Sequence, residues 1–264
     1  MNNYICELNE NVERTHVRYN NRYGLALAGD LYAAKDMDKS KKYPAIVVGA
    51  PYGGVKEQGP SVYANELANC GFVVLTFDPC YMGESGGEPR HVSSPDMFSE
   101  NISAGVDFLG LQSYVDREMI GALGICGSGG FALSAAAVDM RIKAVVTASM
   151  YDMSFAARAG QSPEQISETK KKLSLQRWKD AENNYPEYIP TFPEEAVMEI
   201  PDEMQGIWRE FFEFYATNRG HHRNARGGFT TTSDLAFINY PLLAHIDEIS
   251  PRPILFIVGE QAES

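Results

Sequence analysis

Four short apolar runs alternate with amphipathic segments in the first 150 residues, and this alternation most restricts the possible fold. Each run is continuously apolar, as in strands that are buried on both faces. Segments with helical spacing separate the runs, and strand and helix in repeated succession are typical of a parallel sheet with crossover helices. The sequence therefore predicts an α/β fold. The four runs are residues 44–49, 72–78, 119–125 and 142–148.

The chain begins with a different pattern. Residues 12–19 and 23–32 are rich in β-formers and alternate in polarity, and Asn20-Asn21 between them supplies a turn. We therefore expect two antiparallel strands before the parallel part of the sheet.

Residues 151–240 interrupt the α/β pattern. They are helical, charged and aromatic, with several prolines, and an apolar run at 253–259 then resumes the strand pattern. We expect a core formed by residues 1–150 and 241–264, with 151–240 inserted as a helical cap. One face of a helix in this insertion carries an apolar stripe, which we expect to pack onto the core: Met204, Ile207, Trp208, Phe211 and Tyr215.

Composition excludes several classes of protein. The 264 residues are 44% hydrophobic, which excludes a disordered chain, and the net charge of −12 argues against a nucleic-acid-binding protein. No run approaches the ~20 apolar residues that span a bilayer, and the N-terminus lacks the features of a signal peptide. Four irregularly spaced cysteines fit neither a metal site nor a disulfide scaffold. We expect a reduced, cytoplasmic protein without a membrane partner.

The stretch LGICGSGG (residues 123–130) ends the third apolar run and opens a helix. That is the setting of a nucleophile elbow, a strained turn that presents a side chain at the carboxyl edge of the sheet. Small residues must stand two places before and after the nucleophile, because strand and helix nearly touch there. Gly124 and Ser128 meet this need around Cys126, but small residues also flank Ser128, so both registers stay open. We favour Cys126, since a thiol ionises near neutral pH and a helix N-terminus promotes that ionisation.

This motif, together with DPCYMGESGG at 78–87 and GAPYGG at 49–54, resembles the α/β-hydrolase superfamily. Within it, the chain is similar to bacterial and fungal hydrolases related to dienelactone hydrolases and X-prolyl peptidases. The resemblance extends over nearly the whole chain and implies the α/β-hydrolase fold, a mostly parallel sheet with a helical cap. Dienelactone hydrolases carry a cysteine at the elbow, which supports Cys126. The commoner motif is G-x-S-x-G, so the presence of Ser128 leaves the nucleophile open.

Hydrolysis through an acyl-enzyme needs hydrogen-bond donors for the oxyanion. One is the backbone N–H after the nucleophile, which belongs to Gly127 in the preferred register. The second should come from the loop after the first parallel strand, which contains Tyr52 and Gly53. X-prolyl peptidases have a similar Pro-Tyr loop whose phenol hydroxyl is the donor, so the resemblance implies Tyr52. The backbone N–H of Tyr52 or Gly53 is the alternative, and packing against the cap is a purely structural role for Tyr52.

A triad also needs an acid and a histidine, which follow the nucleophile in that order in this superfamily. The acid belongs directly after the strand that ends at Gly259, where Glu260 and Glu263 stand. The histidine belongs after a further helix and strand, for which residues 261–264 leave no room. We therefore expect the natural chain to be longer.

The five histidines that are present fit the role of base poorly. Three lie away from the expected site: His16 in the N-terminal strands, His91 after the Gly-rich loop and His245 before the last strand. His221 and His222 lie in a cap loop that could overhang the site, but we expect them to be solvated or packed residues.

These features predict a hydrolase or acyl transferase that acts on a small ester, thioester, lactone or amide. Cys126 would attack the carbonyl carbon while Tyr52 and Gly127 hold the oxyanion. An X-prolyl peptidase and a non-catalytic binding protein on the same scaffold are the alternatives. We expect no cofactor or metal, because neither H-E-x-x-H nor a G-x-G-x-x-G that opens a helix is found. The expected partner is a small-molecule acyl substrate, and the apolar cap stripe permits a homodimer without requiring one.

Overall fold

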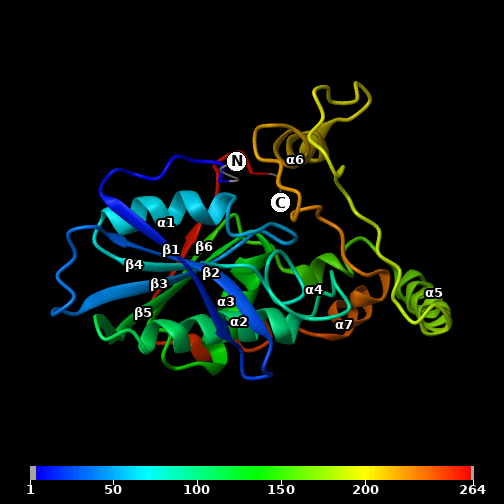
Figure 1. Ribbon diagram of the computed structural model, residues 1–264. Helices are drawn as coiled ribbons and strands as arrows, with labels where there is room; N and C mark the ends of the chain where they lie inside the picture. The colour runs from blue at the N-terminus through cyan, green and yellow to red at the C-terminus, as the bar shows by residue number, and fades with distance from the viewer. Residues whose placement is uncertain (1–3, 263–264) are drawn as a thin grey trace.

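The computed structural model describes residues 4–262 and contains a seven-stranded sheet with helices on both faces (Figure 1). The strands lie in the order β1-β2-β4-β3-β5-β6-β7. β2 pairs antiparallel with β1 and β4, and all other neighbours are parallel. The strands are β1 Val12–Asn20, β2 Ala26–Ala34, β3 Tyr43–Gly49, β4 Val73–Phe77, β5 Val115–Ile125, β6 Ala144–Ala148 and β7 Ile254–Ile257.

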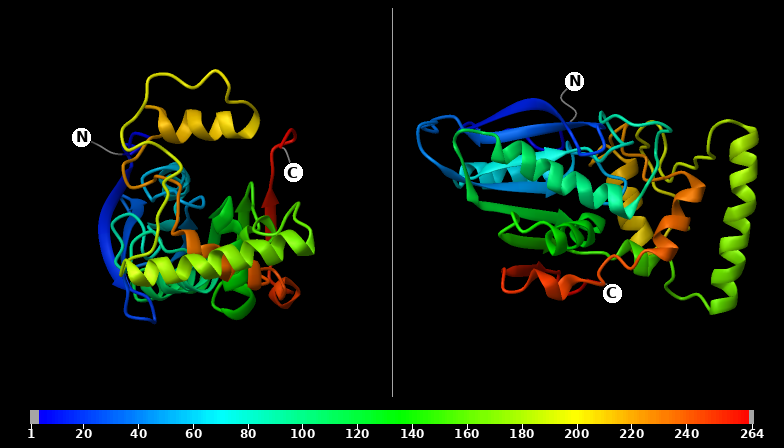
Figure 2. Two further views of the ribbon diagram at one scale, coloured as in Figure 1. Left: turned by 90° about the vertical axis from the view of Figure 1, so that its right-hand side faces the viewer. Right: turned by 90° about the horizontal axis from the view of Figure 1, so that it is seen from below.

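Helices cover the sheet from two sides, as Figure 2 shows in two further views. α1 packs on one face, and α2 and α3 pack beside one another on the other. The helices are α1 Gly59–Asn69, α2 Pro95–Gly110, α3 Gly127–Val138, α4 Met153–Ala156, α5 Pro163–Glu182, α6 Gly206–Ala216 and α7 Asp234–Asn239, with short 3-10 turns η1 Thr231–Ser233 and η2 Ile246–Ile249.

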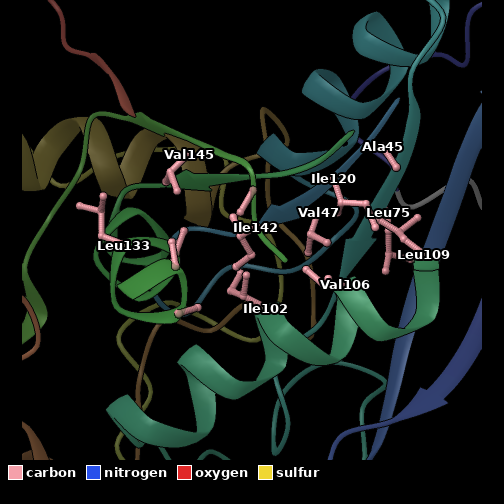
Figure 3. Packing of buried hydrophobic residues seen from close by; sticks show 14 of the residues in the cluster. Ala45, Val47, Leu75, Ile102, Val106, Leu109, Ile120, Leu133, Ile142 and Val145 are labelled. Atoms are coloured by element: carbon pink, nitrogen blue, oxygen red, sulfur yellow. The ribbon is translucent and has the colours of Figure 1, made fainter. Parts of the chain in front are cut away.

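The two faces arise from the alternation of side chains along each strand. Val47 packs with Ile102 of α2 (Figure 3), whereas the next residue, Val48, packs with Ala64 of α1. Both valines are fully buried. The apolar runs that form β3 and β4 therefore correspond to strands that are covered on both faces. The run at 253–259 differs, because Leu255 and Phe256 of β7 are each 55% exposed.

The predicted fold class is confirmed, since the sheet is mostly parallel and its antiparallel strands come first in the chain. Two predicted boundaries were wrong. β5 begins at Val115 rather than at residue 119, because the polar residues 116–118 continue the extended strand outside the core. α3 begins at Gly127 rather than near Gly130, since the turn between β5 and α3 consists of Cys126 alone.

All seven strands of the sheet lie outside residues 151–240, which contain α4, α5, α6, η1 and α7. α5 extends along the side of the molecule, away from the sheet (Figure 2). The division into core and cap stays a prediction. Among residues 4–262, no helix combines the length and the apolar character that crossing a membrane requires.

The prediction that the apolar stripe of α6 packs onto the core was wrong for most of its length. Trp208 is 62% exposed, and Ile207 and Phe211 are 40% and 38% exposed. Only the end of the helix is packed, where Tyr215 stacks on Phe192 with 5.0 Å between ring centroids. Helical periodicity identifies which side chains share a face, but it does not reveal what that face contacts.

Candidate active site

Cys126 joins the end of β5 to the start of α3 in a backbone conformation that non-glycine residues rarely adopt. Its φ is 53° and its ψ is −124°. The Cys126 amide donates to the Ala148 carbonyl of β6 at 2.9 Å, and its carbonyl accepts from Gly129 and Tyr151 at 2.9 and 3.0 Å. Strained backbone persists where the surroundings fix it in several ways, and it concentrates at functional sites. This is the geometry expected of the central residue of a nucleophile elbow.

Glycines allow strand and helix to meet so closely beside this turn. A Cβ at Gly124 would lie 2.1 Å from the carbonyl oxygen of Ser128, which no side chain can tolerate. A Cβ at Gly127 would lie 2.8 Å from the Cβ of Tyr52. The second contact brings the backbone after Cys126 directly against the loop that follows β3.

Ser128 lies in the first turn of α3, and its environment differs from that of Cys126. The side chain is buried, and its hydroxyl donates to the carbonyl oxygen of Ala50 at the end of β3. Positive φ falls on Cys126 and not on Ser128. The backbone geometry therefore favours the register centred on Cys126.

The Cys126 side chain is partly accessible at the start of α3. Burial raises the pKa of the Cys126 thiol above its ordinary value, and interactions with the backbone of Gly127 and Tyr52 lower it in part. The same two amides are the sequence-predicted donors for an oxyanion formed next to the sulfur. Gly127 directly follows Cys126, and a Cβ at Gly127 would lie 2.8 Å from the Cβ of Tyr52, so both predicted donors lie next to Cys126.

The side chain of Tyr52 is engaged by other residues. Its hydroxyl donates to the Ser93 hydroxyl at 2.8 Å, and its ring lies 4.1 Å from that of Phe229, centroid to centroid. Burial raises the pKa of the Tyr52 phenol far above its ordinary value. This geometry favours the backbone alternative over the phenol hydroxyl as oxyanion donor. Gly53 has a φ of 84° and packs against Gly227 of the insertion.

Glu260 lies in an exposed turn after β7. β7 reaches the same edge of the sheet as Cys126, because Ile257 pairs with Ala148, the residue whose carbonyl accepts from Cys126. Within residues 4–262, no hydrogen bond or ion pair joins Glu260 to Cys126. Glu263, the other candidate acid, lies outside the described residues. The role of Glu260 stays a prediction.

The histidines have other neighbours. His16 contacts Asp30 at 3.1 Å, His91 stacks on Tyr188, and the exposed His245 contacts Glu248. His221 lies 3.4 Å from the carbonyl oxygen of Pro193. His222 is buried, and its Nε2 has no partner among the described residues.

Two features near the site were not predicted from the sequence. Burial raises the pKa of Tyr215 far above its ordinary value, and the charge of the Cys126 thiolate adds to this shift. The apolar stripe had marked Tyr215, but only as a packing residue. The other feature is the buried side chain of Lys56, which carboxylates surround. A lysine in a loop gives no sequence signal of burial.

Comparison with known proteins agrees with the resemblance found in the sequence. Residues 30–174 match the dienelactone hydrolase family. The chain belongs to this family. It is 47% identical to the uncharacterized protein PA2218 of Pseudomonas aeruginosa, over 97% of this chain and 70% of that protein. The crystal structure of the hypothetical protein PA2218 superposes with a TM-score of 0.91, at 46% identity, covering 98% of this chain and 81% of that one.

Two fungal relatives of this dienelactone hydrolase family member have named activities. The thiohydrolase aneE of Aspergillus aculeatus is 27% identical over 94% of this chain and 78% of its own length. The acyltransferase drtE of Aspergillus calidoustus is 28% identical over 78% of this chain and 66% of its own length. The family assignment supports a hydrolase. The α/β-hydrolase fold predicted from the sequence is confirmed, since the crystal structure of the α/β hydrolase GrgF from Penicillium sp. sh18 superposes with a TM-score of 0.76 at 22% identity, covering 94% of this chain and 81% of that one.

Proposed function

We propose that this member of the dienelactone hydrolase family hydrolyses a small ester, thioester, lactone or amide through a covalent acyl-enzyme on Cys126. The observation that carries the proposal is the positive φ of 53° at Cys126, at the junction of β5 and α3. This conformation directs a nucleophile toward the carboxyl edge of the sheet. The backbone amides of Gly127 and Tyr52 beside the sulfur are the proposed oxyanion donors.

The reaction would proceed in two steps. The sulfur of Cys126 forms a bond to the carbonyl carbon, the bond to the leaving group breaks, and the thiol proton ends on the leaving group. Water then attacks the thioester, the carbon–sulfur bond breaks, and one proton of water returns to the sulfur. Negative charge develops on the carbonyl oxygen in both steps, where the amides of Gly127 and Tyr52 would stabilise it.

Acyl transfer is the second candidate, because one relative is named an acyltransferase and another a thiohydrolase. Both names are consistent with a common acyl-enzyme that is resolved by different acceptors. In hydrolysis the acceptor is water, and in acyl transfer it is an alcohol, amine or thiol. The X-prolyl peptidase and the non-catalytic binding protein stay predictions without a specific observation in their favour.

Turnover of p-nitrophenyl acetate by the wild type and two variants tests the proposal. We expect Cys126→Ala to abolish both turnover and acetylation of the protein, detected by peptide mass spectrometry. Ser128→Ala should retain acetylation, because the Ser128 side chain is buried and its hydroxyl donates a hydrogen bond to the carbonyl oxygen of Ala50. Acetylation of Ser128, or retained turnover in Cys126→Ala, would overturn the assignment of the nucleophile.

The choice between water and another acceptor can be tested on the same acyl-enzyme. Pre-acetylated protein is mixed with a short alcohol or thiol, and the products are quantified. Acceptor-dependent loss of the acetyl group to a transfer product would favour acyl transfer. A rate of deacylation that is independent of the acceptor would favour hydrolysis.

A further inference from the structure

Lys56 lies in the loop between β3 and α1, and its side chain is almost completely buried among three carboxylates. Its Nζ is 2.5 Å from Glu57 Oε1, 3.1 Å from Asp78 Oδ2 and 2.7 Å from Glu84 Oε2. Carboxylate oxygens of these three acids lie within 4.8 Å of one another, as they would around a metal ion. Here the ammonium group of Lys56 supplies the central positive charge.

This cluster joins two loops at the carboxyl edge of the sheet. Asp78 comes directly after β4, and its Oδ1 accepts the backbone N–H of Lys56 at 2.9 Å. Its Oδ2 accepts the backbone N–H of Glu84, also at 2.9 Å. Both the side chain and the backbone N–H of Lys56 therefore form hydrogen bonds to the loop after β4, and these bonds connect that loop to the loop after β3.

Within the cluster, one ammonium group faces three carboxyl groups. Burial opposes the charged form of Lys56, but Asp78 and Glu57 outweigh it and raise the pKa of Lys56, which therefore stays charged. Burial, with Asp78 beside it, raises the pKa of Glu57 to about 7. Removing the ammonium would leave buried carboxylates without a counter-charge, which is far more costly than losing a surface ion pair. Lys56 is thus the group on which the cluster depends.

The same loop is also held from the side of the insertion. The Gln58 amide donates to the carbonyl oxygen of Gly220 at 2.6 Å. A Cβ at Gly53 would lie 2.9 Å from the Cα of Gly227, so these two backbones are in direct contact. Tyr52 stands between β3 and these contacts, and its Cβ would lie 2.8 Å from a Cβ at Gly127, the residue after Cys126. The position of its amide therefore depends on how firmly the rest of the loop is fixed.

We propose that Lys56 is a positioning residue, which fastens the loop after β3 to Asp78 and Glu84 and so holds the Tyr52 amide at the oxyanion site beside Cys126. The proposal rests on the proposed acyl-enzyme function. An oxyanion donor acts only when its position is fixed before the charge develops. Loosening the loop should thus slow steps that form an oxyanion and spare those that do not.

Two reactions of the same sulfur test this proposal. Acetylation of Cys126 by p-nitrophenyl acetate forms an oxyanion, whereas alkylation by iodoacetamide is a displacement at carbon that forms none. The measured quantity is the ratio of the two second-order rate constants, each at its pH-independent limit. Lys56→Met should lower this ratio at least about tenfold, since removing one oxyanion donor altogether costs roughly 100- to 1,000-fold. Glu84→Gln, which alters a half-exposed side chain and should fold, should lower the ratio by a smaller factor of about three.

Arg252→Met is the matched control, because Arg252 is also a cation that fastens separate segments. Its guanidinium donates to the carbonyl oxygens of Ala136, Asp139 and Ile142 at 2.7, 3.0 and 2.9 Å. These groups lie near the amino end of β6, at the opposite edge of the sheet from Cys126. The control should lower the melting temperature and leave the ratio unchanged.

The outcomes separate the two proposals. If wild-type Cys126 is alkylated but never acetylated, the proposed function fails, and the positioning role of Lys56 fails with it. If Cys126 of the wild type is acetylated, and Lys56→Met and Glu84→Gln both show the wild-type ratio of acetylation to alkylation rate constants, only the positioning role is overturned. A ratio that falls equally in Arg252→Met would also overturn it, because the effect would then reflect general loosening of the fold.

Discussion

The amide of Cys126 donates to the carbonyl oxygen of Ala148 at 2.9 Å, so the strained residue after β5 is fixed to the end of β6. Both polar backbone groups of Cys126 are hydrogen-bonded, because its carbonyl accepts from Gly129 and Tyr151. Neighbouring elements therefore hold the unfavourable φ, while the side chain itself remains partly accessible. Changes that disturb this junction should affect stability and reactivity together.

The first prediction concerns Gly124, two residues before Cys126. A Cβ there would meet the Ser128 carbonyl oxygen at 2.1 Å, and that oxygen belongs to rigid helix backbone. Gly124→Ala should lower the free energy of unfolding by about 2 kcal/mol or more, because strand and helix must move apart. It should also slow alkylation of Cys126 by iodoacetamide. Urea denaturation and alkylation rates measure the two effects.

Gly110→Ala is the control for this prediction. Gly110 is the last residue of α2, and the nearest atom to a Cβ there would be 3.8 Å away. Alanine should leave stability unchanged or raise it by up to about 1 kcal/mol, because it favours helix and restricts the unfolded chain. Equal stability of Gly124→Ala and wild type would contradict the close approach of β5 and α3.

The sequence contained enough information for the sheet and for the elbow, but not for the contacts between loops. The continuous apolar runs of β3 and β4 predicted buried strands, although the similar run of β7 is largely exposed. The small residues around Cys126 are a local requirement of the turn. The burial of Lys56 depends instead on Asp78 and Glu84, which the fold brings to it from another loop. Likewise, the bond from the Tyr52 hydroxyl to Ser93 joins residues far apart in the chain. Local pattern cannot predict such pairs.

A second prediction concerns the acidity of the Cys126 thiol. Burial raises its pKa, with Gly127 and Tyr52 opposing only in part, so the thiolate fraction at neutral pH is below that of a free cysteine. The rate of alkylation should rise with pH and reach its midpoint above about pH 8.5, the ordinary value for a thiol. The measurement uses a variant in which the other accessible cysteines, Cys6 and Cys70, are serine. A midpoint near pH 6 or 7 would contradict the prediction that burial raises the pKa of the Cys126 thiol.

A third prediction concerns Glu57 and the dependence of stability on pH. Burial and the charge of Asp78 raise the pKa of Glu57 from 4.5 to about 7, with Lys56 opposing. Between these pH values the folded protein holds a proton that the unfolded chain has released. The contribution of Glu57 to stability should therefore be fully present below about pH 4.5 and decline as the pH rises toward 7, by up to about 1.4 kcal/mol for each pH unit.

Glu57→Gln removes this titration while retaining the size of the side chain. The difference in unfolding free energy between wild type and Glu57→Gln, measured in urea from pH 4.5 to 8, isolates the contribution of Glu57. Other groups of the cluster, namely Lys56, Asp78, Glu84 and the buried His222 near Asp78, are common to both proteins. A difference that does not vary with pH would contradict a raised pKa for Glu57.

The last prediction compares two aromatic residues with very different surroundings. Trp208 on α6 is 62% exposed, whereas Phe131 of α3 is 2% exposed and packs edge-on against Phe98. Trp208→Gln should change the free energy of unfolding by no more than about 0.5 kcal/mol, as is usual for surface positions. Phe131→Ala should cost about 3–5 kcal/mol, because it removes buried area and leaves a cavity in the core. The measurement is made at low protein concentration, so that contacts between molecules do not contribute. A large loss of stability in Trp208→Gln would then mean that α6 packs onto the core, as its apolar stripe alone predicts.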